Sequence, residues 1–389
     1  MVYCDYAATT PMSDIALEVY QDVAKNFFGN ASSLHDTGGK AMDILDQARA
    51  ILADIFHTQP RQIVFTSGGT ESNLLAVDSL LRASPIKEKK HIITSEAEHS
   101  SLYYYFQELS KSEDIEVTFL PLGVDGQIDI EELLQTVQPH TSLVSIQHVS
   151  GETGVIQPIA DIGKKLKEQD IYFHSDAIQS FGKIDLEPIL PHVDCLTISS
   201  HKIFGPKGVG AIYFHPQVTL LPHPVITNHE HGLRPGTVDV PAIASFSASA
   251  LQQKQQISHN KKHLTYIREL FCEKLKNLEV PLRPITSPAQ CPSIVGCIAD
   301  FVQGDYVMLE YNRNGIDIST GSACSIGYTN IPRSISPFIS DREEGNRYIR
   351  FSFSHLTTEQ DISQIVEISN RIFVRMKEER TNYEKKINW

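Results

Sequence analysis

Two charged side chains, Lys202 and Asp176, each follow an apolar run of the kind that forms a buried strand. Lys202 ends the motif Ser199-Ser200-His201-Lys202, and a Gly-Pro-Lys-Gly turn follows shortly after it. A lysine amine can form a Schiff base with the aldehyde of pyridoxal 5'-phosphate (PLP), and a carboxylate can keep the ring nitrogen protonated so that the ring accepts electrons. An isolated lysine is more often a solvated surface residue, so the prediction of a PLP site rests on the pair and its flanking motif.

A glycine pair at a strand-to-helix junction predicts the phosphate site that PLP needs. Gly68, Gly69 and Thr70 follow the apolar run 62–66 and precede a helix-length segment. Glycines let the backbone approach an anion, and the N–H groups of a helix N-terminus bind it. In isolation, a plain turn with a threonine cap is the commoner reading of this pattern. Thr237, in an Arg-Pro-Gly-Thr run, is a second candidate phosphate donor.

Two further polar residues follow predicted strands. His99 is placed to stack on a cofactor ring and to carry protons, although a surface histidine that caps the next helix is the alternative. Gln179, three residues beyond Asp176, is within reach of the phenolic oxygen of the cofactor. His229 and His231 form a His-x-His pair without a supporting acid or cysteine cluster, and we therefore expect no metal site.

Cys324 lies among small and hydroxyl residues in the run Gly-Ser-Ala-Cys-Ser. A buried structural cysteine normally has apolar neighbours, so this composition predicts an exposed thiol on a mobile segment. Beside PLP chemistry, such a thiol is suited to move between the cofactor and an acceptor. Arg350 is a charge inside an apolar strand and needs an anionic partner, for which a substrate α-carboxylate is the natural candidate.

The order of predicted elements indicates an α/β protein. Between about residues 60 and 215, strands alternate with helix-length segments, which predicts a mostly parallel sheet covered by helices. Ligands of such sheets bind at the carboxyl ends of the strands, where Asp176 and Lys202 fall. The predicted strands are 62–66, 91–94, 117–120, 143–148, 172–174, 195–199 and 210–214.

The character of the chain changes near residue 255. Predicted strands at 294–301 and 348–353, and an amphipathic helix after a capping box at 357–360, indicate a smaller α+β domain. We expect residues 15–258 to form the large domain that binds PLP. We expect residues 1–14 and 259–389 to form the small domain that carries the reactive cysteine.

Bulk composition excludes several classes of function. The net charge of −13 argues against a nucleic-acid partner. No uninterrupted apolar stretch of about 18 residues is present, so we expect no membrane span. The start of the chain lacks a basic segment followed by an apolar one, and the six cysteines contain no C-x-x-C pair. Free thiols of this kind fit a reducing compartment, and we expect a cytoplasmic enzyme.

Taken together, these motifs resemble those of the cysteine desulfurases of the NifS/IscS type, group I, within the class V aminotransferase family. The resemblance covers nearly the whole chain, and the motifs occur in family order. They are Asp5-Tyr6-Ala7-Ala8-Thr9-Thr10-Pro11, Phe28-Gly29-Asn30, Thr66-Ser67-Gly68-Gly69-Thr70-Glu71-Ser72-Asn73, Asp176-Ala177-Ile178-Gln179-Ser180, Ser199-Ser200-His201-Lys202 and Gly321-Ser322-Ala323-Cys324.

The resemblance implies the PLP-dependent transferase fold type I, with a seven-stranded sheet, and a homodimer. The implied reaction converts L-cysteine to L-alanine and leaves the sulfur as a persulfide on Cys324. An acceptor protein then takes the sulfur for iron–sulfur cluster or other sulfur-cofactor assembly.

The resemblance also assigns roles to individual residues. Lys202 carries PLP, Asp176 pairs with the pyridinium, and His99 stacks on the ring and transfers protons. Gln179 bonds the phenolic oxygen, and Asn30 and Arg350 hold the substrate carboxylate. Thr70, Ser199 and His201 bind the phosphate, and Thr237 comes from the other subunit. The full set of residues that the resemblance implies around the cofactor is Gly69, Thr70, His99, Asp176, Gln179, Ser199, Ser200, His201, Lys202 and Thr237.

Two departures from the family pattern are visible. The family has Asn-Asn-Glu where this chain has Ser150-Gly151-Glu152, and the second Asn normally touches the phenolic oxygen, which Gly151 cannot do. The alternative is that Gly151 only serves a tight turn with a positive φ. The glycine-rich stretch of the family before His-Glu is replaced here by Ile226-Thr227-Asn228.

Three other functions remain open at this point. A PLP-dependent transaminase or a selenocysteine lyase would share the fold, with Cys324 incidental or used only to discriminate between sulfur and selenium. A scaffold of low activity that docks a sulfur acceptor would explain the change at Gly151.

Overall fold

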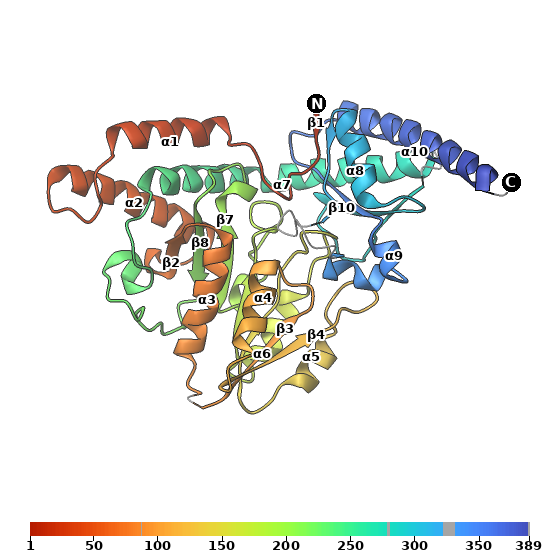
Figure 1. The fold of residues 1–389 in the computed structure, drawn as a ribbon. Helices are drawn as coiled ribbons and strands as arrows, with labels where there is room; N and C mark the ends of the chain where they lie inside the picture. Colours follow the sequence, from red (N-terminus) through yellow and green to blue (C-terminus); the bar gives the residue numbers. More distant parts are fainter. Residues whose placement is uncertain (87, 278–280, 322–330, 388–389) are drawn as a thin grey trace.

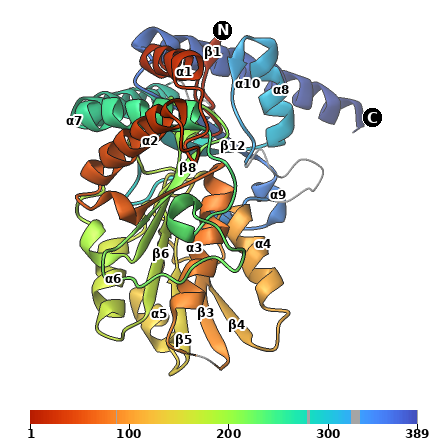
Figure 2. The same ribbon diagram turned by 90° about the vertical axis from the view of Figure 1, so that its left-hand side faces the viewer.

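The computed structural model describes residues 1–86, 88–277, 281–321 and 331–387, so the cysteine predicted to react, Cys324, lies outside the described residues. A seven-stranded sheet with helices on both faces forms the larger part of the molecule, and a smaller α/β layer packs beside it (Figures 1 and 2). The α/β architecture expected from the alternating pattern is therefore confirmed.

The large sheet has the strand order β2-β8-β7-β6-β5-β3-β4. Strand β8 runs antiparallel to both of its neighbours, and the other adjacent pairs are parallel. The prediction of a mostly parallel seven-stranded sheet is thus confirmed. Its strands are β2 (Ile63–Thr66), β3 (Lys90–Ser95), β4 (Ile115–Leu120), β5 (Thr141–Ser145), β6 (Tyr172–Asp176), β7 (Cys195–Ser199) and β8 (Gly210–Phe214).

Successive side chains of these strands enter different cores because side chains alternate across a sheet. Val64 and Cys195 pack under α3 and α4. Phe65 and Leu196 point to the other face, where they pack under α2, α6 and the first half of α7 (Val240–Asn277). Burial of both faces explains why the strands read as continuous apolar runs. The helices of this part are α1 (Asp14–Asn26), α2 (Asp36–Ile55), α3 (Gly69–Ala83), α4 (Ser100–Leu109), α5 (Ile130–Thr136) and α6 (Ile159–Lys167).

The smaller layer contains a three-stranded antiparallel sheet of order β12-β10-β9 and a parallel pair of β1 with β11. Its core includes Phe271, Tyr311 and Phe351. Its elements are β1 (Val2–Tyr3), β9 (Leu282–Pro284), β10 (Ile294–Ala299), β11 (Ile316–Asp317), β12 (Tyr348–Ser352), α8 (Gly304–Arg313), α9 (Arg342–Gly345) and α10 (Glu359–Ile387).

Helix α7 (Val240–Asn277) contributes to both cores. Phe246 packs in the core of the large sheet and Phe271 in that of the small layer, and Figure 1 shows the helix running from α1 and α2 toward α10. The boundary expected at residues 258/259 therefore falls inside one continuous helix. Although α7 has 38 residues, no helix among the described residues is both long and apolar enough to cross a membrane.

The capping box of α10 lies one residue later than predicted. The Thr358 N–H donates to Asp361 Oδ2 at 2.8 Å, and the Asp361 N–H donates to Thr358 Oγ1 at 3.1 Å. The pair is therefore Thr358 with Asp361 rather than the predicted pair of Thr357 with Gln360. The short aspartate carboxylate performs the reciprocal bond that glutamate or glutamine usually makes.

A buried ion pair holds the loop before α7 against the sheet. Arg49, on α2, pairs with Glu230 at 2.7 Å, and the two side chains are only 5% and 1% exposed. Glu230 also accepts the Phe65 N–H at 2.6 Å. Two charges removed from water are stable only when paired, so each depends on the other.

We expect Arg49→Met to destabilise the protein by about 3–5 kcal/mol, because it leaves the Glu230 carboxylate buried without a counterion. The free energy of unfolding from urea denaturation measures this change. Lys111→Met, which breaks an ion pair whose side chains are 71% and 69% exposed, is the matched control and should change stability little. Equal effects of the two substitutions would contradict the importance of the buried pair.

Candidate active site

A cleft with a volume of about 230 Å³ lies at the carboxyl ends of the parallel strands. The loops after β2, β3, β5, β6 and β7 all contribute to it, together with the segment after β1 and one residue of β12. This is the edge at which open α/β sheets bind ligands. Its lining residues are Ala7, Ala8, Gly69, Thr70, His99, Gln147, Val149, Gly151, Glu152, Asp176, Ile178, Gln179, Ser199, His201, Lys202 and Arg350.

Lys202 enters the cleft from a short 3-10 turn directly after β7. Its Nζ donates to Ala7 O at 2.6 Å and to Ala8 O at 2.7 Å. These two carbonyl groups belong to the segment that follows β1, so the N-terminal segment orients the amine. A primary amine held in this way is positioned to form a covalent bond with an aldehyde.

Asp176 ends β6 and is only 6% exposed. Asn73 Nδ2 donates to Asp176 Oδ2 at 2.8 Å, and the Ile178 N–H donates to Asp176 Oδ1 at 2.9 Å. Each carboxylate oxygen thus accepts a hydrogen bond from a fixed donor. Such donors favour the ionised carboxylate, which is the form that pairs with a pyridinium.

The residues predicted to hold phosphate form a cradle with unsatisfied donors. Gly69 begins α3, and a Cβ at this position would lie 2.4 Å from Ile178 Cδ1, so a larger residue would require the Ile178 side chain to move. The hydroxyls of Ser199 and Ser200 are buried and have no hydrogen-bond partner within the part of the chain that is described. Buried hydroxyls normally have a partner, and an anion at the N-terminus of α3 fits this requirement. Ser199 lines the cleft, whereas Ser200 lies behind it.

His201 lies at the same end of the cleft and carries no positive charge near neutral pH. Burial, and the nearby charge of Lys202, lower its pKa to about 4. Its Nδ1 lies 3.1 Å from Thr9 Oγ1. A phosphate would therefore meet a neutral imidazole here rather than a cation.

His99 caps the next helix, as the alternative from the sequence has it, and also lies in the cleft where a role on the cofactor ring stays a prediction. It is the N-cap residue of α4, where its Nδ1 accepts the Ser101 N–H at 3.2 Å, and it also lines the cleft. Gln179 donates from Nε2 to Ala7 O at 2.9 Å and accepts from Lys183 Nζ at 2.9 Å. Burial lowers the pKa of Lys183 to about 8.

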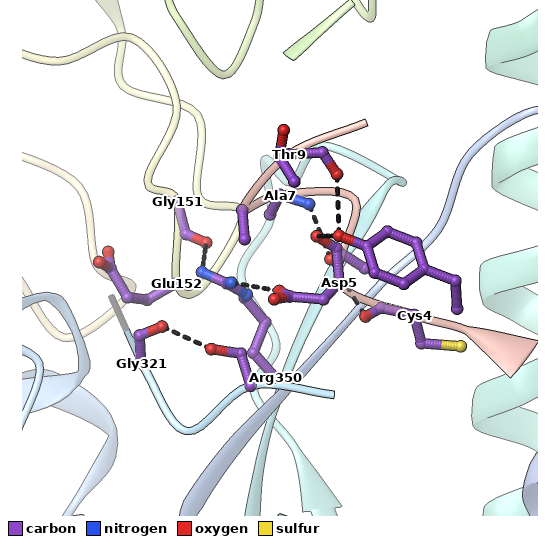
Figure 3. Close-up of polar contacts among 12 residues, drawn as sticks. Cys4, Asp5, Ala7, Thr9, Gly151, Glu152, Gly321 and Arg350 are labelled. Atoms are coloured by element: carbon purple, nitrogen blue, oxygen red, sulfur yellow. Dashed lines mark hydrogen bonds and ion pairs between the residues drawn. The ribbon is translucent and has the colours of Figure 1, made fainter. Parts of the chain in front are cut away.

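Arg350 is 3% exposed, and its guanidinium lies between Gly151 and Asp5 (Figure 3). It donates to Asp5 Oδ1 at 2.7 Å and to Gly151 O at 2.9 Å, and its Nε has no partner among the described residues. Burial opposes the charge on Arg350, but neighbouring Tyr348 and Asp5 more than offset it and raise the pKa of the guanidinium. The predicted anionic partner is thus Asp5 in this structure, with one buried donor left over.

The backbone conformation at residue 151 does not require glycine. Gly151 is absent from the glycines with a positive φ, which excludes the alternative that a left-handed turn demands glycine here. A Cβ at this position would lie 3.3 Å from Gln179 Nε2. Neighbouring Ser150 does not line the cleft, because its hydroxyl contacts Glu152 Oε2 at 3.3 Å and caps the local turn.

Sequence reasoning assigned no role to Gln147 and Glu152, which line the cleft, or to Glu98, which is buried beside Gln147. Gln147 lines the cleft, and its N–H donates to the carboxylate of Glu98 at 2.9 Å. Burial raises the pKa of Glu98 to about 8, so this acid holds a proton at neutral pH. Glu152 accepts from Ser334 of the small layer at 3.0 Å. The position of Gln147 just after a buried strand and the place of Glu152 in the Ser150-Gly151-Glu152 run were usable signals, whereas nothing marked Glu98.

Two predicted residues lie outside the cleft of their own chain. Asn30 is exposed, and its side chain accepts the Ser32 N–H at 2.9 Å. Thr237 is exposed in the loop before α7. Cys324 belongs to residues 322–330, outside the described ranges, so its role stays a prediction.

A mostly parallel seven-stranded sheet with a lysine and an aspartate at its carboxyl edge defines the PLP-dependent enzymes of fold type I. Residues 2–365 match the family described as Aminotransferase class-V. The chain belongs to this family and, within it, to the cysteine desulfurases of the NifS/IscS type.

Individual relatives agree with this assignment. The chain is 44% identical over 371 residues to a protein of Bacillus subtilis (strain 168) named for the cysteine desulfurase NifS, covering 94% of this chain and 93% of that one. A solved NifS-like protein superposes with a TM-score of 0.87 at 29% identity, covering 95% and 98% of the two chains. A solved structure of SspA in complex with cysteine has a TM-score of 0.77 at 31% identity and covers 91% and 99%.

The described thiols should be unreactive in the folded protein. Cys4, Cys195, Cys291 and Cys297 are buried and Cys272 is half-buried, and burial raises the pKa of Cys4, Cys195, Cys272 and Cys297. Because only the thiolate is alkylated rapidly, we expect iodoacetamide near neutral pH to modify Cys324 first. Peptide mass mapping measures this order, and unfolding in urea should expose all six thiols. Early labelling of Cys4 or Cys195 would contradict the prediction.

Proposed function

We propose that this desulfurase binds PLP through Lys202 and transfers the sulfur of L-cysteine to Cys324. The observation that carries the proposal is the cleft in which the Lys202 amine, the Asp176 carboxylate and the Arg350 guanidinium meet the Ser199 hydroxyl, which has no partner in the part of the chain that is described. When bound, PLP supplies an electron sink that weakens bonds at the substrate α- and β-carbons.

Each of these residues has a distinct task. The amine of Lys202 tethers the cofactor, and Asp176, held by two donors, maintains the proton on the ring nitrogen. The N–H groups of Gly69 and Thr70, with the hydroxyl of Ser199, bind the phosphate. Gln179 presents its amide to the phenolic oxygen, with its orientation set by Lys183.

Substrate recognition uses the buried guanidinium of Arg350. A carboxylate is its natural ligand, because the charge is desolvated and the Nε donor lacks a partner among the described residues. Asp5 fixes the side chain from the opposite direction at 2.7 Å. L-cysteine as the substrate is supported by the relatives named cysteine desulfurase and by the related SspA structure that holds cysteine.

The proposed sulfur transfer needs no further oxidant or reductant. The Cys324 thiolate attacks the substrate sulfur, an S–S bond forms, the substrate C–S bond breaks, and its electrons leave with the protonated product alanine. The persulfide on Cys324 is then available to an acceptor protein. Iron–sulfur cluster or other sulfur-cofactor assembly is the use that we propose for it.

A second copy of the chain would complete the site. The loop after α1 exposes Phe28 (73%) and Leu34 (105%), and the loop before α7 exposes Ile226 (98%). Ser32 and His229 join these loops at 3.0 Å. Exposed apolar residues of this size mark interaction surfaces. Since the same two loops contain Asn30 and Thr237, a homodimer would bring both residues to the cleft of the partner.

The other functions are separable from this one. A transaminase would release no sulfide or persulfide from cysteine, and a selenocysteine lyase would act on cysteine poorly. A scaffold without turnover would not develop the visible absorption of bound PLP. The buried Ser199 hydroxyl, which has no hydrogen-bond partner among the described residues, argues against the scaffold, because a bound anion would satisfy it.

We expect Cys324→Ser to bind PLP and L-cysteine but to form no persulfide, because a hydroxyl lacks the thiolate nucleophile. Visible absorption measures cofactor and substrate binding, and mass spectrometry measures the persulfide. Lys202→Ala is the complementary control, which should fold but lose the absorption band of tethered cofactor and all turnover. Persulfide formation by Cys324→Ser on another cysteine would show that a different thiol is the nucleophile.

Gly151→Asn tests the electronic consequence of the missing donor. A second donor to the phenolic oxygen stabilises its anion, so the midpoint of the pH titration of the visible band should fall. One hydrogen bond to a charged group contributes roughly 1.5–3 kcal/mol before solvent competes. Gly151→Ala is the matched control, because its Cβ presses equally on Gln179 Nε2 at 3.3 Å without adding a donor. A midpoint that is the same in both variants would refute the donor argument.

A further inference from the structure

A chain of hydrogen bonds connects His99 to Asp176. His99 Nδ1 lies 2.8 Å from Ser101 Oγ, and Asn73 Nδ2 donates to Ser101 Oγ at 3.1 Å. The same Asn73 Nδ2 donates to Asp176 Oδ2 at 2.8 Å. Two residues to which the sequence assigned no role, Ser101 and Asn73, thus lie between His99 and the Asp176 carboxylate.

The orientation of the Asn73 amide is determined by its partners. A carboxylate oxygen only accepts hydrogen bonds, so the amide nitrogen must face Asp176. The amide oxygen correspondingly accepts the Thr197 hydroxyl. Asn73 and Thr197 are both 0% exposed, so water does not compete for these groups. Both hydrogens of the Asn73 amide are therefore committed, one to Asp176 and one to Ser101.

The backbone of Ser101 determines the direction of the bond between Ser101 and His99. The Ser101 N–H donates to His99 Nδ1 at 3.2 Å, so this nitrogen is an acceptor. The Ser101 hydroxyl, which accepts from Asn73, therefore donates its single hydrogen to the same nitrogen. A ring nitrogen that accepts two hydrogen bonds carries no proton, and the proton of the neutral imidazole must then lie on Nε2.

We propose that Ser101 is a positioning residue that, held by Asn73, keeps His99 in the Nε2–H tautomer, so that His99 exchanges protons through Nε2. This inference rests on the proposed role of His99 in proton transfer. Without the Ser101 hydroxyl, the backbone N–H would be the one remaining donor of this network at Nδ1, and the other tautomer would become populated. The ring would then present the wrong nitrogen for part of the time.

The tautomer can be measured without the cofactor. In cofactor-free protein labelled with 15N-histidine, NMR shifts of the ring nitrogens distinguish a protonated from an unprotonated nitrogen, and His99→Gln identifies the resonances. We expect an unprotonated Nδ1 in the native chain and a mixture of tautomers in Ser101→Ala. A proton on Nδ1 of native His99 would overturn the proposal.

Kinetics of the PLP-loaded enzyme supply the second readout. We expect Ser101→Ala to lower kcat about 2- to 10-fold, the range for one neutral hydrogen bond, with KM and cofactor binding unchanged. Ser101→Thr keeps the hydroxyl and should restore both the tautomer and kcat. Ser100→Ala makes the same chemical change one residue earlier on α4, outside this network, and should behave as the native enzyme.

The outcomes separate this inference from the proposed function. An unchanged tautomer together with an unchanged kcat in Ser101→Ala overturns the positioning role. A tautomer shift with an unchanged kcat supports the hydrogen-bond network and contradicts the participation of His99 in proton transfer. Loss of activity in Ser100→Ala as well would show that α4 is merely sensitive to substitution and would overturn the assignment to Ser101.

Discussion

The cleft depends on the docking of the N-terminal segment, residues 5–10, between the two cores. Its Ala7 and Ala8 carbonyl groups each accept a hydrogen bond from the Lys202 amine, and Ala7 O also accepts one from the Gln179 amide. Asp5 pairs with Arg350 from the small layer. Buried donors must find acceptors to offset their desolvation, and this short segment supplies acceptors to both sides. The segment thereby sets where the amine and the guanidinium lie relative to each other.

The polar groups at the carboxyl edge of the sheet are buried, and their hydrogen bonds to one another fix their orientations. Asn73 commits its amide to Asp176 and Ser101, and Glu98 holds a proton because its surroundings raise its pKa. In a medium of low polarity, a hydrogen bond that is fully satisfied orients its members more rigidly than the same bond in water. This rigidity suits the proposed function, in which an acid, an amine and a histidine must keep fixed positions around one cofactor.

Two parts of the site differ in how complete they are within one chain. At the end with Asp176, Asn73 and His99, the side chains are hydrogen-bonded to one another. At the end proposed for the phosphate, buried hydroxyls have no partners among the described residues, and the loops with Asn30 and Thr237 lie outside the cleft. Exposed Phe28 and Ile226 beside those residues are consistent with completion by another copy of the chain.

The strands of the large sheet and the order of its motifs could be predicted from the sequence, because both are local properties. The runs 195–199 and 210–214 coincide with β7 and β8, since strands buried on both faces need continuous apolar residues. The chemistry expected of Lys202 and Asp176 likewise follows from residue type and position at a strand end.

Tertiary structure decided which partners these residues have. Asn73 and Asp176 are 103 positions apart, and Lys202 and Ala7 are 195 apart, so no local pattern reports their contact. The tautomer of His99 depends on where Ser101 and Asn73 meet, and the freedom of Gly151 depends on its φ. The sequence thus determined the elements and the reactive groups, while the packing of distant segments determined their hydrogen bonds, because hydrogen-bond geometry depends on separation in space and not along the chain.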